Sequence, residues 1–282
     1  MLEKYFIALS GRPEETKVDL HMHSTVSDGT WTPAELVRNV KEAVISIFAL
    51  TDHDDIGNVA KTAALAADEG LCFIPGVEIN STWNGYTYHI LGLGIDTGNQ
   101  GLCGLLDENV KKVDRKDDEA VAYLEKMYPQ ISNEEFKAYE NKRERGGWKA
   151  LNYLIDKNLC NNYKDYFKLF KNDSGGFAAV RFRSPAEVIA VIRQAGGCAV
   201  LAHPGASFYD PDYRSVLEHM LLEGIQGIEC YHPENNEAVR RYALDFCKLN
   251  KLLITGGSDC HGAFLPARCL GVPDVRLSDL VL

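Results

Sequence analysis

The chain has 282 residues, of which 45% are hydrophobic, and a formal net charge of −10 at pH 7. This length allows one large domain, or one domain with a sizeable insertion, and the apolar fraction is enough for a full hydrophobic core. The acidic balance argues against binding along a long nucleic-acid duplex, which requires a broad basic surface. A short anionic substrate remains possible, because bound cations can dominate the local field.

The sequence lacks the segments that would direct the chain to a membrane. It has no run of about 18 apolar residues, and its first residues lack the basic start and small-residue cleavage site of a signal peptide. Its eight cysteines form no CxxC pair, and several lie in apolar runs such as GCAVLAH. This pattern favours buried, reduced thiols. We expect a cytoplasmic protein without membrane contact, and we expect it to be a monomer.

Apolar, β-prone runs alternate with segments of helical periodicity along most of the chain. The expected strands are 17–22, 46–52, 71–79, 86–95, 197–202, 225–231 and 252–257. The expected helices are 33–43, 57–69, 185–195, 212–223 and 235–249. Thr32-Pro33 and Ser184-Pro185 each have the form of an N-cap followed by proline. Alternating elements favour parallel strands, and seven strands with their polar ends together favour an α/β barrel.

The stretch from 99 to 181 breaks this alternation. It contains charged helical segments such as KKVDRKDDEAVAYLEKM and no strand-like run of the same type. We predict a barrel domain formed by residues 1–98 and 182–282, with 99–181 inserted as a helical subdomain that caps the barrel mouth. A passive structural insertion is the alternative.

Histidines and carboxylates stand near the ends of the predicted strands. His21 and His23 are two positions apart, so both imidazoles face one side of a strand and could bind one metal ion. Asp259 and His261 repeat this spacing after the last strand. Because active sites of α/β barrels lie at the C-terminal strand ends, we expect these side chains to converge on one polynuclear metal centre. The other candidates are Asp28, His53, Glu78, His89 and His203.

Some of these candidates have a competing interpretation. Asp28 stands in an Asp-Gly pair, which is common in turns, and His89 on its own could be a core histidine with satisfied hydrogen bonds. His53 lies in TDHDD, whose flanking aspartates could hold a ligand imidazole through its other nitrogen. Glu78 ends the run CFIPGVEIN, where a carboxylate is costly to bury unless it is paired or metal-bound. Its two oxygens could bridge two cations.

The motifs DLHMHSTVSDGTWTP, LTDHDD, PGVEIN, GGCAVLAHPG, GIECYHP and SDCHG, taken in order, resemble those of the PHP (polymerase and histidinol phosphatase) family of metal-dependent phosphoesterases. The resemblance covers residues 17–95 and 184–272. It is greatest to small bacterial members that act on nucleotides and short oligoribonucleotides and that carry a helical insertion after the fourth strand. It implies a distorted seven-stranded β/α barrel.

The resemblance also implies three divalent metal ions, for which zinc, manganese and iron are candidates. The first ion would be bound by His21, His23, Glu78 and Asp259. The second would be bound by Glu78, His89 and His203, with Glu78 as the bridge. The third would be bound by Asp28, His53 and His261.

Such ions suit phosphate ester hydrolysis, because they lower the pKa of bound water toward roughly 7 and neutralise phosphate oxygens. We hypothesise that a hydroxide bridging the first two ions is the nucleophile, with Glu78 and Asp259 as catalytic ligands. His232 could contact the phosphate or protonate the leaving alkoxide, although it could equally be a polar residue at a strand end. The basic candidates for substrate binding are Arg145, Lys149, Arg181 and Arg268.

The predicted function is hydrolysis of phosphate monoesters or short phosphodiesters, as a 3′,5′-bisphosphate nucleotidase or a 5′-to-3′ oligoribonuclease. The expected partner is therefore a small phosphorylated substrate, either a nucleotide or a short oligoribonucleotide. A histidinol-phosphate-type phosphatase is the alternative within this class, and a non-catalytic, metal-binding regulatory module is the alternative outside it. Trp148 and Lys149 replace a Gly-Arg-Pro-His-like segment of the family, which leaves the substrate specificity open.

Overall fold

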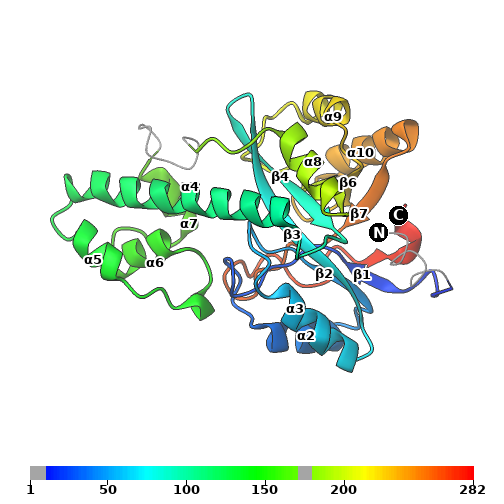
Figure 1. Ribbon diagram of the computed structural model, residues 1–282, viewed down its shortest axis with the longest axis horizontal. Helices are drawn as coiled ribbons and strands as arrows, with labels where there is room; N and C mark the ends of the chain where they lie inside the picture. The colour runs from blue at the N-terminus through cyan, green and yellow to red at the C-terminus, as the bar shows by residue number, and fades with distance from the viewer. Residues whose placement is uncertain (1–10, 171–179) are drawn as a thin grey trace.

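A mixed sheet forms the centre of the computed structural model, which describes residues 11–170 and 180–282 (Figure 1). Its strand order is β7-β6-β5-β4-β3-β2-β1-β8. The strands are β1 (Lys17–Asp19), β2 (Ile47–Leu50), β3 (Cys72–Trp83), β4 (Tyr86–Leu93), β5 (Cys198–Leu201), β6 (Gly227–Tyr231), β7 (Leu253–Gly256) and β8 (Val275–Arg276). All seven predicted strands are present. The eighth, β8, is a two-residue addition that pairs antiparallel with β1.

Main-chain hydrogen bonds between the segments that follow β1 and β7 bring the ends of the sheet together into a nearly closed barrel. The Asp259 N–H donates to the His21 carbonyl at 2.8 Å, and the His23 N–H donates to the Cys260 carbonyl at 2.9 Å. Gly257 makes this approach possible, because a Cβ at that position would lie 2.5 Å from the His21 nitrogen.

Strand β4 departs from the predicted parallel pairing, since it is antiparallel to both β3 and β5. The pairs β1–β2, β2–β3, β5–β6 and β6–β7 are parallel, as predicted. The reason lies in the connection between β3 and β4, which consists of Asn84 and Gly85 at φ values of 51° and 83°. Two residues in this conformation can close a hairpin but cannot form the crossover that a parallel pair requires.

Alternate residues of the strands face the barrel interior and the outer helices. In β2, Ile47 and Ala49 belong to the cluster inside the barrel, whereas Phe48 and Leu50 pack outward. The outer layer consists of α2 (Pro33–Glu42), α3 (Val59–Asp68), α8 (Pro185–Gln194), α9 (Tyr213–Leu222) and α10 (Glu237–Asn250). Helices α2 and α8 begin at the predicted N-caps, and each N-cap forms a capping box with a glutamate three residues later.

The chain between β4 and α8 forms helices that extend to one side of the barrel (Figure 1). They are α4 (Gln100–Glu125), α5 (Asn133–Ala138), η1 (Arg143–Arg145), α6 (Lys149–Asp156) and α7 (Tyr163–Lys168), while η3 (Leu277–Asp279) lies near the end of the chain. The start of α4 packs into the barrel core through Leu102 and Leu105. Its second half joins α5, α6 and α7 around a separate core that includes Val121, Phe136 and Leu154. Among the described helices, none is both long and apolar enough to cross a membrane.

Candidate metal centre

The nine predicted ligands lie close together at one end of the barrel. Most follow the C-terminal ends of parallel strands, but Glu78 lies inside β3, which continues to Trp83 beyond the predicted end at 79, and His89 lies in the first half of β4. Because β4 is antiparallel, its first half reaches the same end of the barrel, and His89 pairs with Asn80 of β3. The expectation that His89 ends a strand is therefore wrong, although the strand direction still brings it to the cluster.

The first predicted group, His21, His23, Glu78 and Asp259, is fully enclosed. Four of its atoms, His21 Nε2, His23 Nε2, Glu78 Oε2 and Asp259 Oδ1, face one another across 3.0–3.4 Å. None of the four has a hydrogen-bond partner among the described residues. Buried polar atoms seldom lack a partner, and two imidazole nitrogens with two carboxylate oxygens suit zinc, manganese or iron. These residues therefore fit a divalent cation.

The two carboxylate oxygens of Glu78 face different sets of imidazoles. Oε2 lies 3.1 Å from His21 Nε2 and 3.2 Å from His23 Nε2. Oε1 lies 2.9 Å from both His89 Nδ1 and His203 Nε2. This division is the geometry that a carboxylate shared between two cations requires.

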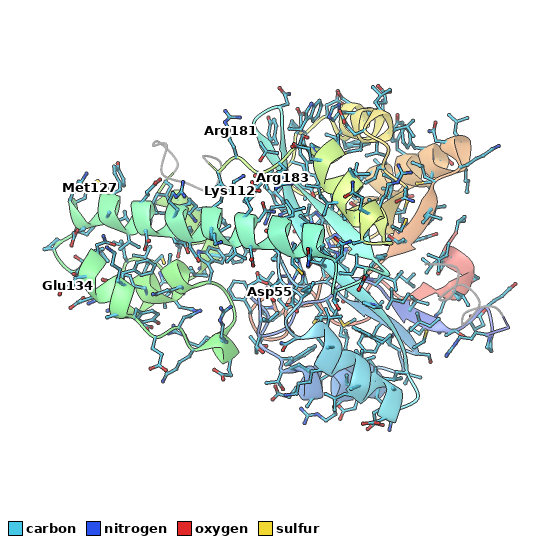
Figure 2. The ribbon with its side chains drawn as sticks, viewed as in Figure 1. Asp55, Lys112, Met127, Glu134, Arg181 and Arg183 are labelled. Atoms are coloured by element: carbon cyan, nitrogen blue, oxygen red, sulfur yellow. The ribbon has the colours of Figure 1, made fainter. Side chains whose placement is uncertain are left out.

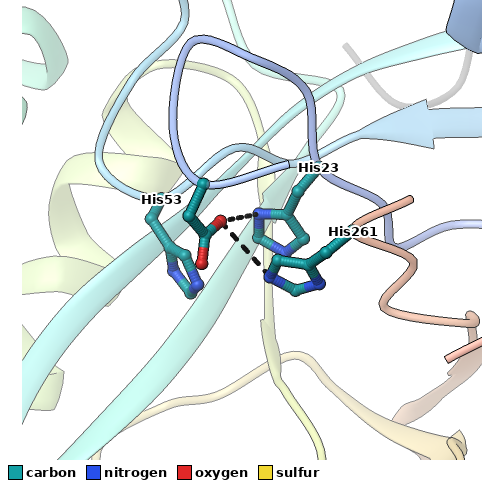
Figure 3. Close-up of side chains that lie close together, drawn as sticks. His23, His53 and His261 are labelled. Carbon is teal, nitrogen blue, oxygen red and sulfur yellow. Dashed lines mark ion pairs between the residues drawn. The ribbon is translucent and has the colours of Figure 1, made fainter. Parts of the chain in front are cut away.

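The third predicted group gathers around the Asp28 carboxylate, and Figure 3 shows the rings of His23, His53 and His261 close together there. Asp28 Oδ1 is 3.3 Å from His261 Nε2 and 3.6 Å from His23 Nδ1. His53 completes the group, although its Nδ1 also lies 3.1 Å from Glu78 Oε2. His23 thus directs one nitrogen toward the first group and the other toward the third, which the sequence did not predict.

Burial and opposite charge act against each other on the ionisable groups of the cluster. Burial would raise the pKa of Glu78, but the imidazoles of His21, His53 and His89 outweigh it and hold that pKa well below its usual range. Burial would lower the pKa of His23, but Asp259 and Glu78 raise it to about 10. At His53 burial prevails and lowers the pKa to about 3. The Glu78 carboxylate is consequently ionised at neutral pH and available to bind a cation.

Two of the predicted ligands have backbone conformations that side chains rarely adopt. His203 has a φ of 28° and Asp259 a φ of 51°, both in the left-handed region that is unfavourable for residues other than glycine. Such conformations cluster at functional sites, where the surrounding structure enforces them. Here the enforcing contacts include the His203 N–H, which donates to Glu229 at 2.9 Å, and the Asp259 N–H, which donates to the His21 carbonyl.

Glu229 of β6 is a functional candidate that the sequence analysis missed. It is fully buried, and its Oε1 lies 3.0 Å from His21 Nδ1. The signal was present in the sequence, because Glu229 stands inside the apolar strand GIECY in the same way that Glu78 ends its own apolar run.

His232 lies against the first group and has a defined tautomer. The Glu234 N–H donates to its Nδ1 at 3.1 Å, so the neutral ring must carry its proton on Nε2. That Nε2 is 3.3 Å from Asp259 Oδ2. The structure therefore directs an N–H donor from His232 at a predicted metal ligand.

Among the four basic residues predicted to bind substrate, the structure brings Arg268 to the cluster. Its guanidinium pairs with Asp259 and Glu234. The other three do not contact the cluster. Arg145 pairs with Asp156 inside the insertion, Lys149 donates to the Lys137 carbonyl, and Arg181 is exposed on the segment that leads to α8 (Figure 2).

The PHP domain family matches residues 19–176 of the chain. A 3′,5′-nucleoside bisphosphate phosphatase of Chromobacterium violaceum is 30% identical over 251 residues, which cover 86% of this chain and 87% of that protein. The chain belongs to the PHP family. It is also similar to the 5′-3′ exoribonuclease Rnm of Escherichia coli, with 31% identity over 249 residues that cover 86% of this chain and 84% of that protein.

The fold is similar to that of a proposed metal-dependent phosphoesterase from Bifidobacterium adolescentis. The TM-score is 0.78 with 26% sequence identity, and the match covers 93% of each chain. The predicted family and barrel class are thus confirmed, and this PHP protein is a metal-dependent phosphoesterase.

Proposed function

We propose that this PHP protein hydrolyses phosphate esters of nucleotides or short oligoribonucleotides with three divalent metal ions, of which zinc, manganese and iron are candidates. The observation that carries the proposal is Glu78, whose two oxygens face two separate sets of imidazoles in a fully buried position. The relatives support the substrate class, because they are named as a bisphosphate phosphatase and an exoribonuclease.

The three groups of side chains would hold one ion each. The first is His21, His23, Glu78 and Asp259; the second is Glu78, His89 and His203; the third is Asp28, His53 and His261, beside His23. Bound ions of this kind supply a water of lowered pKa and neutralise the charge of a phosphate.

Two residues beside the first group would act on the substrate directly. His232 presents its Nε2–H at the edge of the cluster, where it can donate to a phosphate oxygen or to the leaving oxygen. Arg268 is fixed there by Glu234 and Asp259, and its planar guanidinium suits a phosphate. His232 and Arg268 would both contact the phosphate of the substrate. The nucleoside would then contact other residues around the barrel mouth.

We also propose that the barrel comprises residues 1–98 and 182–282 and that 99–181 is an inserted helical cap. The separate hydrophobic core of α4 to α7 supports this division. The segment 171–179 lies outside the described residues.

Phosphate release and metal content together test the function. We expect manganese-supplemented protein to release phosphate from a nucleoside 3′,5′-bisphosphate, or nucleotides from a 5′-phosphorylated oligoribonucleotide, faster than phosphate from histidinol phosphate. Faster turnover of histidinol phosphate would favour the alternative phosphatase. Fewer than two bound metals together with no turnover would favour a regulatory module.

Substitution of Asp259 links the activity to the cluster. Asp259→Ala should lose metal and activity together, because Asp259 Oδ1 faces His21 and His23. Asp274→Ala is the matched control, since Asp274 pairs with Arg276 and Lys17 next to the N-terminal end of β1. A metal-free Asp259→Ala protein with full activity would contradict the proposal.

A further inference from the structure

The third group of predicted ligands is the least enclosed part of the cluster. The Asp28 and His53 side chains are 17% and 28% exposed, whereas those of His21, His23 and Glu78 are fully buried. Asp28 stands on a loop, and His53 lies beyond the end of β2, where a single parallel β-bridge pairs it with Glu78. Because a loop or a single bridge fixes a side chain less firmly than a continuous strand, contacts from other elements can contribute to positioning these two ligands.

Asn109 of α4 provides such support for the loop that carries His53. Asn109 is fully buried, and its Nδ2 donates to Asp54 Oδ1 at 2.8 Å and to the Asn80 carbonyl at 3.1 Å. The Asp54 carboxylate also accepts from the Asn80 N–H at 3.2 Å and from Asn80 Nδ2 at 2.5 Å. Asp54 has a φ of 47°, and its N–H donates to the Glu78 carbonyl at 2.8 Å. The inserted helix therefore fixes the residue that follows His53.

Arg143 of η1 provides support for the loop that carries Asp28. Its Nη1 donates to the Val26 carbonyl at 2.7 Å and to the Ser27 carbonyl at 3.4 Å. The Gly147 N–H donates to the Asp28 carbonyl itself at 2.8 Å. Three hydrogen bonds from one short segment of the insertion thus reach three successive carbonyl groups of the loop.

The insertion and the loop that carries Asp28 lie too close together to admit a side chain at Gly146. Gly146 has a φ of 69°, and a Cβ there would lie 2.8 Å from the Asp28 carbonyl oxygen and 2.9 Å from Thr30 Cγ2. Phe264 stands on the loop that follows His261. Its ring centroid lies 6.2 Å from that of His261 and 6.4 Å from that of Trp148 in the insertion. The insertion therefore reaches all three loops that carry the third group.

We infer that the inserted helices position the third metal site, with Asn109 holding the His53 loop and Arg143 holding the Asp28 loop. The inference rests on the proposed three-metal function. Asn109 and Arg143 are positioning residues, since each acts through main-chain or carboxylate groups of the loops that carry the predicted ligands. Strand pairing holds Glu78 and His89 independently of the insertion. We therefore expect substitution of Asn109 or Arg143 to weaken the binding of the third ion and to leave the other two ions bound.

Metal titration of the full chain tests this inference. Asn109→Ala and Arg143→Ala should each weaken the binding of the weakest manganese ion by at least about 10-fold, the lower end of the range for lost outer contacts to a metal site. The two tighter ions should bind as in the wild type. Excess manganese should then restore turnover, which separates weakened binding from a failure to fold.

Two variants of the insertion serve as matched controls. Tyr153→Phe removes a buried hydroxyl that bonds to Ser132 within the insertion, and Lys157→Ala removes a cation that pairs with Glu135. Both should lower the unfolding temperature or leave it unchanged without altering metal binding. Arg143 is exposed, so its variant should fold even if Asn109→Ala does not.

The outcomes distinguish this inference from the proposed function. Three ions in the wild type and a selectively weakened third ion in both variants would support it. Three ions in the wild type and unchanged binding in the variants would overturn the positioning role and leave the proposed function intact. Fewer than three ions in the wild type would overturn both the metal count and this inference. Equal weakening by the control variants would also overturn it, because the effect would then follow stability alone.

Discussion

His21 Nδ1 lies 3.0 Å from Glu229 Oε1, and both side chains are fully buried. An ionised carboxylate can only accept, so this contact holds the imidazole proton on Nδ1 and leaves Nε2 to face Glu78 and Asp259. A carboxylate behind a ligand imidazole fixes the ring and increases its basicity. Because Glu229 Oε2 also accepts the His203 N–H, one buried carboxylate orients two predicted ligands.

Glu229→Gln should therefore weaken metal binding while preserving the fold. The amide keeps the volume of the side chain, but its NH2 group cannot accept a hydrogen bond, so its single oxygen can serve either His21 Nδ1–H or the His203 N–H and not both. We expect a loss of about 10- to 100-fold in metal affinity, measured as the manganese concentration for half-maximal activity. Glu187→Gln is the control, because Glu187 caps α8 and should affect only stability. An unchanged half-activating concentration would show that Glu229 does not orient a metal ligand.

His232→Ala should lower the turnover rate without removing metal. The substitution deletes an N–H donor directed at Asp259, and general acid contributions of this kind are worth about 10²- to 10⁴-fold in rate. Turnover at saturating substrate and metal content per chain should be measured on the same preparation. His219→Ala is the matched control, since His219 stacks on Trp83 outside the cluster. If turnover is unchanged while the unfolding temperature falls, His232 serves only in packing.

The sequence was sufficient to predict the strands and the cluster, because both depend on short-range patterns. Alternation by two positions placed His21 with His23, and the predicted strand ends indicated most of the other predicted ligands, whereas His89 joined them through the family resemblance. The direction of β4 was not predicted, since it depends on the two-residue turn at Asn84 and Gly85 rather than on the alternation of elements. The Asn-Gly pair is typical of a hairpin turn, but the alternation of strand-like and helical segments along the chain favoured parallel pairing.

The contacts between the insertion and the barrel could not be predicted from the sequence, for a different physical reason. Arg145 and Lys149 were candidates on charge alone, yet Asp156 and the Lys137 carbonyl hold them inside the insertion. Arg143, two residues before Arg145, reaches the Asp28 loop instead. Which of these neighbouring cations reaches the barrel depends on the path of η1, and no periodicity or spacing encodes that path.

Gly257→Ala should destabilise the protein and disturb the cluster together. A Cβ would lie 2.5 Å from the His21 nitrogen, so the segments after β1 and β7 must separate. We expect a loss of about 1–3 kcal/mol in the free energy of unfolding, as for other overpacked sites, together with weaker metal binding. Gly104→Ala in α4 should have the opposite effect, because nothing lies within 4 Å of its Cβ. That helical glycine should yield a gain of about 0.5–1 kcal/mol. Urea unfolding measures the stability of both variants. An unchanged free energy of unfolding for Gly257→Ala would contradict the close approach of the segments after β1 and β7.

Glu108→Gln should reduce stability at neutral pH but not in acid. Hydrogen bonds from Arg183 and Lys112 lower the pKa of Glu108 to about 2, from an ordinary value of 4.5. A lowered carboxyl pKa means that the folded state favours the ionised form, so this stabilisation is present above pH 4.5 and is lost as the pH falls toward 2. The groups are partly exposed, so the effect should be about 0.5–1 kcal/mol at pH 7. Urea unfolding of both proteins at pH 7 and pH 3 should show the difference shrinking in acid. Glu119→Gln, at an exposed position of the same helix, should show no such difference, and a difference for Glu108→Gln that is independent of pH would contradict the ion pair.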